Sequence, residues 1–474
     1  MSVVNAVSPR TVAYQRCRAG VPAPGSRPGL AWRVLRSRWT WTLLAVGLAC
    51  LWCGWQIYRT VTAPVAQTGG LTVPGLNDDA IRQSAGYALR TLLPLTALFL
   101  LADRFRPQRL LIWSIALLWG GLVAVELSLT INTWVSERMA VVGQVSGTMQ
   151  ERTAIYVAPF VEEASKATVI FLIAFLDRGR ITSRLSGVVL AGLSAVAFAF
   201  SENIIYYARV IVYGSYTESA GNVHAALMEL VKMRGLYTCF GHPLFTMMTG
   251  LGVAVAVRQR SKLVRVVAPL AGFMLAALAH MMFNFVASLS DQEIRLQMYF
   301  LLALPLVGGA ILLVVMTCLS QGRLIRDRLN DYVMVGWLPA SYPYLFARLR
   351  TRGWALAMSL WHGSFWSTWR LQRAVTELAY LRDAITRGLV DQGGLGREHE
   401  LIVRIRRWRS QRAIENPQGL RPYLWRRRAK KIGYPGPVDP AAPWASPGFE
   451  AGTTGPPVGV TRFTAVDPRW GPPA

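Results

Sequence analysis

Charged residues are scarce in this sequence, and acidic residues are the scarcer kind. Only 16% of the 474 residues are charged, with 25 Asp+Glu against 51 Lys+Arg, while 53% are hydrophobic. So little charge excludes an ordinary soluble domain and is typical of a chain with several membrane-spanning segments. The net charge of +26 is then explained by basic cytoplasmic loops beside anionic lipid, and we expect no nucleic-acid partner.

Familiar signatures of hydrolases are also missing. The sequence has no His-Glu-x-x-His zinc motif, no Gly-x-Ser-x-Gly turn in an apolar run, and no aspartate directly after Gly250-Leu251-Gly252. Serine and aspartyl mechanisms therefore have no support. Cys50 and Cys53 form a Cys-x-x-Cys inside an apolar run, without a second pair or a nearby histidine, which indicates packing rather than metal or redox chemistry.

Long apolar runs dominate the first two thirds of the chain. About eight of them reach the length of roughly 20 residues that a helix needs to cross a hydrocarbon core. They cover residues 39–58, 84–102, 110–132, 154–176, 186–208, 236–257, 266–288 and 297–318. With the N-terminus inside, the Arg-rich loops all fall on the cytoplasmic side. We predict an all-α, polytopic membrane helix bundle with about eight transmembrane helices and both termini cytoplasmic, in the plasma membrane.

The flanks of this bundle differ from it in composition. Segments 371–390 and 398–408 have helical spacing with charges on one face, and residues 426–431 form a basic cluster expected to contact anionic lipid. The predicted domains are a basic disordered cytoplasmic arm (1–38), the transmembrane core (39–320), a cytoplasmic helical region (321–412) and a basic, then Pro/Gly-rich disordered tail (413–474).

Ionisable residues interrupt the fourth to seventh apolar runs at a common depth. They are Glu162, Glu163 and Lys166, then Glu202 with Asn203, then His242, then His280 with Asn284. Counted from the outer end of each run, these groups lie roughly 9–12 Å deep at about 1.5 Å per residue. Each residue taken alone can be explained by a purely structural role. Glu162 could pair with Lys166, and His280 with Asn284, one helical turn apart, and such groups also make contacts between helices. Their coincidence favours a reactive or transport site, because charge at membrane depth is costly.

Four motifs carry a family resemblance. They are Glu162-Glu163-x-x-Lys166, Phe198-x-x-x-Glu202-Asn203, His242-Pro243-Leu244-Phe245 and His280-x-x-x-Asn284. In this order on successive runs they resemble the PrsW family of intramembrane proteases, which is related to CAAX prenyl endopeptidases and bacteriocin-processing membrane enzymes. The resemblance covers about residues 80–320 and implies hydrolysis of a peptide bond of a membrane-anchored protein, for which an anti-sigma factor is the suggested substrate. Glu202 stands where the CAAX-type relatives have a histidine.

The residues suit this chemistry. We expect Glu162 to act as general base on a water, with Glu163 alongside and Lys166 as counter-charge. His242 would orient the water, and His280 and Asn284 would donate to the oxyanion. We also count Glu202 as catalytic and Asn203 as supporting.

Two alternatives stay open at this point. Glu163, His242 and His280 are acceptable ligands for a divalent metal such as zinc, although a metal-independent glutamate mechanism without a cofactor is favoured. The same carboxylates and histidines would also suit a proton-coupled membrane transporter, but no inverted repeat is apparent.

Overall fold

The computed structural model of the protein describes residues 34–66, 72–103, 105, 108, 110–142, 152–177, 181, 183–214, 222–259, 261–289, 291–387, 392–411 and 413–415. The predicted arm (1–38) and tail (413–474) therefore lie almost wholly outside the described residues. The chain divides into two compact units. We call Met1–Phe99, Arg109–Ile181 and Ser186–Val307 the membrane unit, and Leu100–Gln108, Thr182–Leu185 and Gly308–Ala474 the C-terminal unit.

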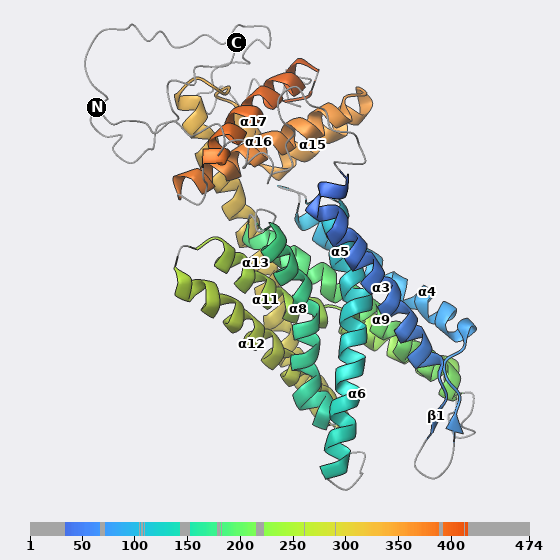
Figure 1. The fold of residues 1–474 in the computed structure, drawn as a ribbon. Helices are drawn as coiled ribbons and strands as arrows, with labels where there is room; N and C mark the ends of the chain where they lie inside the picture. The colour runs from blue at the N-terminus through green and yellow to red at the C-terminus, as the bar shows by residue number, and fades with distance from the viewer. Residues whose placement is uncertain are drawn as a thin grey trace, which may run out of the picture. The chain divides into compact units, whose positions relative to one another are not determined.

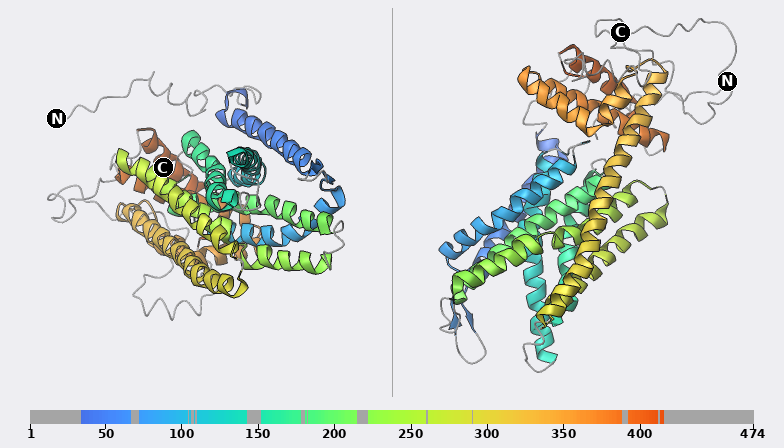
Figure 2. Two further views of the ribbon diagram at one scale, coloured as in Figure 1. Left: turned by 90° about the horizontal axis from the view of Figure 1, so that it is seen from below. Right: turned by 180° about the vertical axis from the view of Figure 1, so that it is seen from behind.

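The membrane unit is a bundle of long helices (Figures 1 and 2). In chain order they are α3 (Arg38–Thr62), α4 (Asp78–Ala102), α5 (Leu110–Leu118) running through η1 (Trp119–Ala124) into α6 (Val125–Val142), η2 (Thr153–Val157) running into α8 (Ala158–Asp177), α9 (Arg184–Gly214), α10 (Val223–Lys232) running into η4 (Met233–Tyr237), α11 (Gly241–Val257), α12 (Lys262–Ala287) and the start of α13 (Gln292–Met334). Strands β1 (Val65–Ala66) and β2 (Thr72–Val73) pair antiparallel between α3 and α4.

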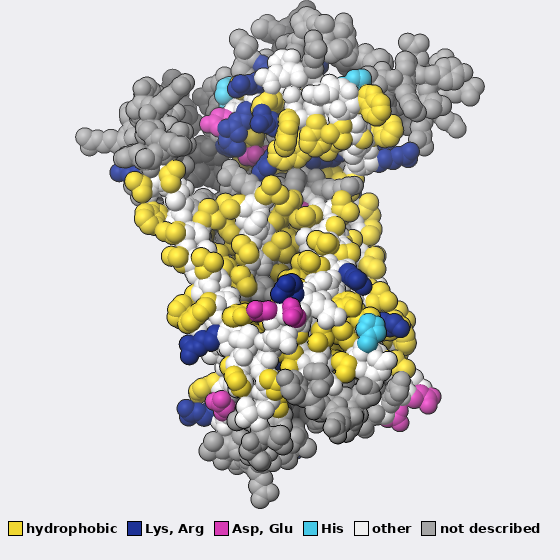
Figure 3. Space-filling view, turned by 90° about the vertical axis from the view of Figure 1, so that its right-hand side faces the viewer, with side chains coloured by type: hydrophobic (Ala, Val, Ile, Leu, Met, Phe, Trp, Pro, Cys, Tyr) yellow, Lys and Arg dark blue, Asp and Glu magenta, His cyan; other side chains and the backbone are white. Residues whose placement is uncertain are grey.

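Helices long and apolar enough to cross a membrane confirm the all-α membrane bundle. Within the described residues there are seven such stretches: Thr40–Thr62, Asp78–Ala102, Leu110–Arg138, Arg184–Gly214, Val223–Val257, Lys262–Ala287 and Leu296–Met334. Hydrophobic side chains cover most of the visible face of this bundle (Figure 3). Helix α8 is outside this set because Glu162, Glu163 and Lys166 interrupt its apolar sequence. The count of eight spans and the cytoplasmic termini remain predictions.

Glycines bring α9, α11 and α12 into close contact. A Cβ on Gly250 of α11 would lie 2.4 Å from the carbonyl oxygen of Gly187 on α9, and one on Gly252 would lie 2.3 Å from the carbonyl oxygen of Ala268 on α12. Such small residues allow membrane helices to pack backbone against backbone. The contact fixes the three helices on which Glu202, His242 and His280 stand.

Segments of π-helix precede α6, α8 and α11 and are tied to neighbouring helices. A π-helical turn leaves backbone carbonyls outside the regular ladder, and side chains from other helices reach them here. These bonds are Ser201 Oγ to the Gly121 carbonyl of η1 (2.6 Å), Asn284 Nδ2 to the Ala154 carbonyl of η2 (2.9 Å) and Thr91 Oγ1 to the Gly235 carbonyl of η4 (2.9 Å). The segments therefore set the position of the helices that follow them.

In its described residues, the C-terminal unit contains the rest of α13 and four further helices. These are α14 (Tyr342–Phe346), α15 (Leu349–Trp361), α16 (Phe365–Thr386) and α17 (Gln392–Ser410). Its core includes Tyr332, Leu378 and Leu401, all buried. Arg352 is also buried and donates to Thr376 Oγ1 (2.7 Å), and burial lowers the pKa of this guanidinium to about 10. The two amphipathic segments read from the sequence thus overlap α16 and α17. Both helices begin earlier than expected, α16 ends at Thr386, and residues 388–390 lie outside the described residues.

Candidate active site

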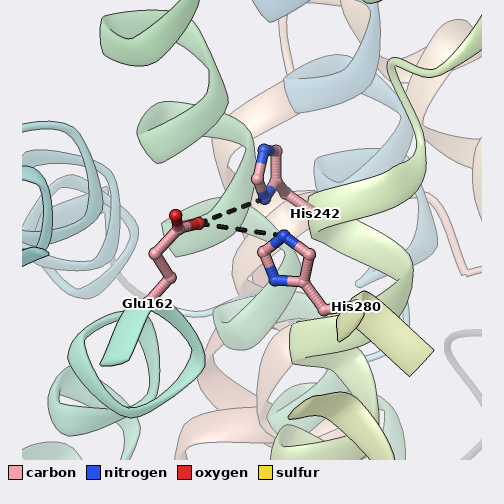
Figure 4. Close-up of side chains that lie close together, drawn as sticks. All are labelled: Glu162, His242 and His280. Atoms are coloured by element: carbon pink, nitrogen blue, oxygen red, sulfur yellow. Dashed lines mark ion pairs between the residues drawn. The ribbon is translucent and has the colours of Figure 1, made fainter. Parts of the chain in front are cut away.

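The site residues expected from the sequence come together in the membrane unit. Helix α8 supplies the Glu162-Glu163 pair, α11 supplies His242, and α12 supplies His280. Glu162 Oε2 lies 4.0 Å from His242 Nδ1 and 3.9 Å from His280 Nε2, and both imidazoles point toward this carboxylate (Figure 4). The two histidine rings meet edge to face, with centroids 5.1 Å apart.

Glu163 lies behind this cluster, and both of its carboxylate oxygens accept hydrogen bonds. Its side chain is 0% exposed. Oε1 accepts hydrogen bonds from Lys166 Nζ (3.0 Å) and His280 Nδ1 (3.1 Å), and Oε2 accepts one from Thr246 Oγ1 (2.6 Å). A carboxylate held by donors on three sides is suited to positioning its neighbours rather than to taking up a proton.

Lys166 is the positive charge at the centre of the site. Its ammonium donates to Glu162 Oε2 (3.1 Å) as well as to Glu163, and it lies 2.9 Å from His242 Nδ1. The side chain is 0% exposed, and its Nζ lies 4.1 Å from the ring centroid of Phe198. The Glu162–Lys166 pairing that the one-turn spacing allowed is therefore present, within a larger network.

Each histidine is oriented by a carboxylate on its far side. His242 Nε2 lies 2.9 Å from Glu202 Oε2, and His280 Nδ1 lies 3.1 Å from Glu163 Oε1. A proton on each of these nitrogens makes the bond to the carboxylate. The lone pair of His242 Nδ1 then accepts from Lys166, and that of His280 Nε2 faces Glu162. Glu202 and Glu163 thus have the same relation to the two rings.

Arg234 also contacts the site residues, although it precedes the predicted apolar run 236–257 and was not among the expected site residues. From η4 it donates to Glu202 Oε2 (2.6 Å) and to Asn203 Oδ1 (2.8 Å), and its guanidinium lies 4.1 Å from the ring centroid of Tyr206. Asn203 therefore supports the site through Arg234. Thr246 was also missed, although its position four residues after His242 on one helix face was a usable signal.

Helix α11 and Asn284 differ from the expected picture. The predicted run 236–257 is broken between η4 and α11, so His242 lies in the first turn of α11, with Pro243 where a missing N–H is tolerated. Asn284 does not pair with His280 in this structure; its Nδ2 donates to the carbonyl oxygen of Ala154. The side-chain amide has a second hydrogen for another partner.

A cavity of about 850 Å³ lies against the cluster. Its walls include five of the predicted catalytic residues: Glu162, Glu202, His242, His280 and Asn284. Glu163 and Lys166 are not among its lining residues. The geometry thus separates groups that a bound molecule can reach from groups that hold them in place.

The cluster also fits a divalent metal in its donor set. One oxygen of Glu162 and one nitrogen from each of His242 and His280 all lie within 4.8 Å of one another, a ligand combination typical of catalytic zinc. The carboxylates behind both rings are the usual supporting partners of ligating histidines. Glu162 takes the place that the sequence-based set gave to Glu163, because the Glu163 oxygens are already engaged. Lys166 does not fit a metal site, because its Nζ already bonds to two of the three donor atoms.

A carboxylate and two imidazoles lie on the wall of a cavity inside an apolar helix bundle, an arrangement with the residue types of a hydrolytic site. The sequence model of the PrsW family, described as intramembrane metalloproteases, matches residues 106–310. This stretch contains every predicted site residue, and the resemblance read from the four motifs is confirmed. The match supports a membrane protease with a membrane-protein substrate, and it does not favour the transporter alternative. Comparisons with curated proteins and with solved structures found no match.

Proposed function

We propose that the membrane unit is an endopeptidase that hydrolyses a peptide bond of a membrane-anchored protein, with Glu162, His242 and His280 at the reacting centre. The observation that carries this proposal is that these three side chains, from α8, α11 and α12, meet on one wall of the cavity. Carboxylates and imidazoles within reach of one water molecule are the usual groups for proton transfer in peptide hydrolysis.

Glu162 is our choice for the general base. It is the member of the Glu162-Glu163 pair that lines the cavity. A water between the Glu162 carboxylate and Nε2 of His280 would give one proton to Glu162 as its oxygen attacks the carbonyl carbon. Glu162 would then return this proton to the leaving amine, which completes hydrolysis without a covalent intermediate.

The surrounding groups have positioning roles in this scheme. Glu202 and Glu163 hold the rings of His242 and His280. Nδ1 of His242 then accepts from Lys166, and Nε2 of His280 is left to accept from the water. Because the Nδ1 proton of His280 is directed to Glu163, the donor to the oxyanion is better assigned to the remaining amide hydrogen of Asn284 alone.

Glu162, His242 and His280 would also hold a metal, as the family description implies. A bound zinc ion would polarise the scissile carbonyl and lower the pKa of its water. For these residues to bind it, Lys166 would have to release His242 Nδ1 and keep only its carboxylate partners. Lys166 already supplies positive charge at this point, and this supports the metal-independent glutamate mechanism.

Cleavage of a single-span reporter protein, tagged on both sides of the membrane, tests the proposal. We expect co-expression with the wild-type chain to release both tagged fragments. The Glu162→Gln variant should insert normally and release none. Glu229→Gln is the matched control, because Glu229 on α10 is exposed and does not line the cavity. Equal cleavage by the wild-type chain and the Glu162→Gln variant would refute the assignment.

The substrate and the cellular location are inferred from the family resemblance and from the charges of the loops. The PrsW resemblance suggests an anti-sigma factor as the substrate, and the Arg-rich loops suggest a plasma-membrane protein with cytoplasmic termini. Immunoblots of a candidate anti-sigma factor in cells with and without the active chain would test the first inference.

A further inference from the structure

One face of α6 carries polar side chains that neither the fold nor the proposed chemistry uses. Ser128, Asn132 and Ser136 are one helical turn apart, so they lie above one another on the same face. All three line the cavity that contains Glu162. We call them the α6 polar face.

Within the part of the chain that the structure describes, two of these side chains have a buried oxygen atom without a hydrogen-bond partner. Ser128 is 3% exposed. Among the described residues, neither Ser128 Oγ nor the Asn132 side-chain oxygen has a hydrogen-bond partner. Buried polar groups are nearly always paired, so an unpaired set that faces a cavity indicates a ligand that completes it.

The cavity has the dimensions of a short extended peptide. Its lining residues on α6 run from Val125 to Glu137, which corresponds to about 18 Å at a rise of ~1.5 Å per residue. An extended chain covers this length with about five residues at ~3.3 Å each. The volume of about 850 Å³ lies within the usual range for ligand sites.

The polar groups are suited to backbone rather than to apolar side chains. A peptide bond inside a membrane helix is shielded by its own ladder, so it must leave the helix to meet Glu162. The freed N–H and C=O groups then need partners, because the hydrocarbon of the membrane offers none. Hydroxyl and amide groups along α6 would supply them. Phe198 and Phe283, which also line the cavity, would contact the apolar side chains of the same segment.

We propose that the α6 polar face is a substrate-binding subsite that hydrogen-bonds the backbone of a locally unwound stretch of about five residues in a membrane-spanning substrate. This rests on the proposed peptidase function. The class of substrate it selects is a single membrane helix with a weak helical stretch, rich in Gly, Pro or Asn, at the depth of Glu162. A uniformly strong helix, such as a run of leucines, is excluded because it does not unwind.

Cross-linking in a non-cleaving background tests binding separately from catalysis. The protein carries Glu162→Gln, and Cys239→Ser removes a cysteine that lines the cavity. A single-span reporter has one cysteine in a five-residue Gly/Pro-containing window, or in an all-Leu window. We expect the Asn132→Cys variant to form a disulfide with the Gly/Pro reporter at least tenfold more than with the all-Leu reporter. Thr130→Cys is the matched control, since Thr130 is on α6 but does not line the cavity.

Equal cross-linking of both reporters at Asn132, equal cross-linking at Asn132 and Thr130, or none at either position would overturn the proposal. The last result would leave water as the occupant of the cavity. These results do not depend on cleavage, so they separate failure of this inference from failure of the proposed function.

Kinetics with otherwise wild-type protein give a second readout. Ser128→Ala and Asn132→Leu should each raise KM for the Gly/Pro reporter about three- to tenfold, the usual effect of one lost hydrogen bond, with kcat nearly unchanged. Thr130→Val should change neither constant. An unchanged KM in both α6 variants would contradict the role assigned to the face.

Discussion

Replacement of Lys166 by methionine is the sharpest test of how the site is held together. The substitution keeps most of the side-chain length and removes the charge. In the structure, the ammonium contacts Glu162 (3.1 Å), Glu163 (3.0 Å) and His242 (2.9 Å) and is 0% exposed. The Lys166→Met variant leaves two carboxylates close together in an apolar bundle with no cation between them.

The expected loss of stability follows from this geometry. Breaking a buried ion pair by removing one partner typically costs about 3–5 kcal/mol, because the remaining charge is uncompensated. Glu163 keeps its hydrogen bonds from His280 and Thr246, so we expect the lower end, about 3 kcal/mol. For a unit of this size, with an unfolding entropy of about 0.6 kcal/mol/K, that is a fall in Tm of roughly 5 °C.

Thermal unfolding of purified protein in detergent measures this effect. The double variant Lys166→Met/Glu163→Gln is the control, because it removes a carboxylate together with its cation. We expect it to recover at least half of the lost Tm while staying inactive. A Lys166→Met protein as stable as the wild type, or a double variant less stable than the single one, would refute the view of Lys166 as the counter-charge.

Three further predictions concern other parts of the site. Arg234→Leu should lower reporter turnover about 10–100-fold, because Glu202 loses the partner that orients it. Arg234→Lys should keep part of the wild-type turnover, and full activity of the leucine variant would contradict this role. Gly250→Ala should lower Tm and activity together, because its Cβ would collide with the carbonyl of Gly187. Gly309→Ala, with nothing within 4 Å, should leave both unchanged or raise Tm slightly. Dialysis against a chelator should leave reporter cleavage unchanged within about twofold, and activity that is lost and then restored by zinc would assign the cluster to the metal mechanism.

The sequence was sufficient to predict the apolar runs and the convergence of their ionisable residues. Periodicity and length predict helices directly, and topology places Glu162, His242 and His280 at one depth. The depth estimate needs only the helical rise per residue and the position in each run, so it requires no tertiary information. The motif order then indicated the family that residues 106–310 match.

The division of roles within the site could not be read from the sequence. Glu162 and Glu163 are adjacent, so composition and depth treat them alike; only side-chain packing directs one to the cavity and the other to Lys166, His280 and Thr246. Arg234 was missed because it precedes the apolar run that begins at residue 236. Only the fold brings its guanidinium to Glu202. The π-helical segments depend on the same tertiary bonds and have no simple pattern in sequence.

The rate constants of the Glu162→Gln and Glu163→Gln variants test the central claim most directly. Both proteins would be reconstituted in liposomes with a cleavable reporter, and kcat measured at saturating reporter after equal insertion is verified. If Glu162 is the base and Glu163 a positioning residue, kcat should fall by about 10³-fold or more in the first variant and about 10–100-fold in the second. Wild-type turnover by the Glu162→Gln variant, or a larger loss from Glu163→Gln than from Glu162→Gln, would contradict the account.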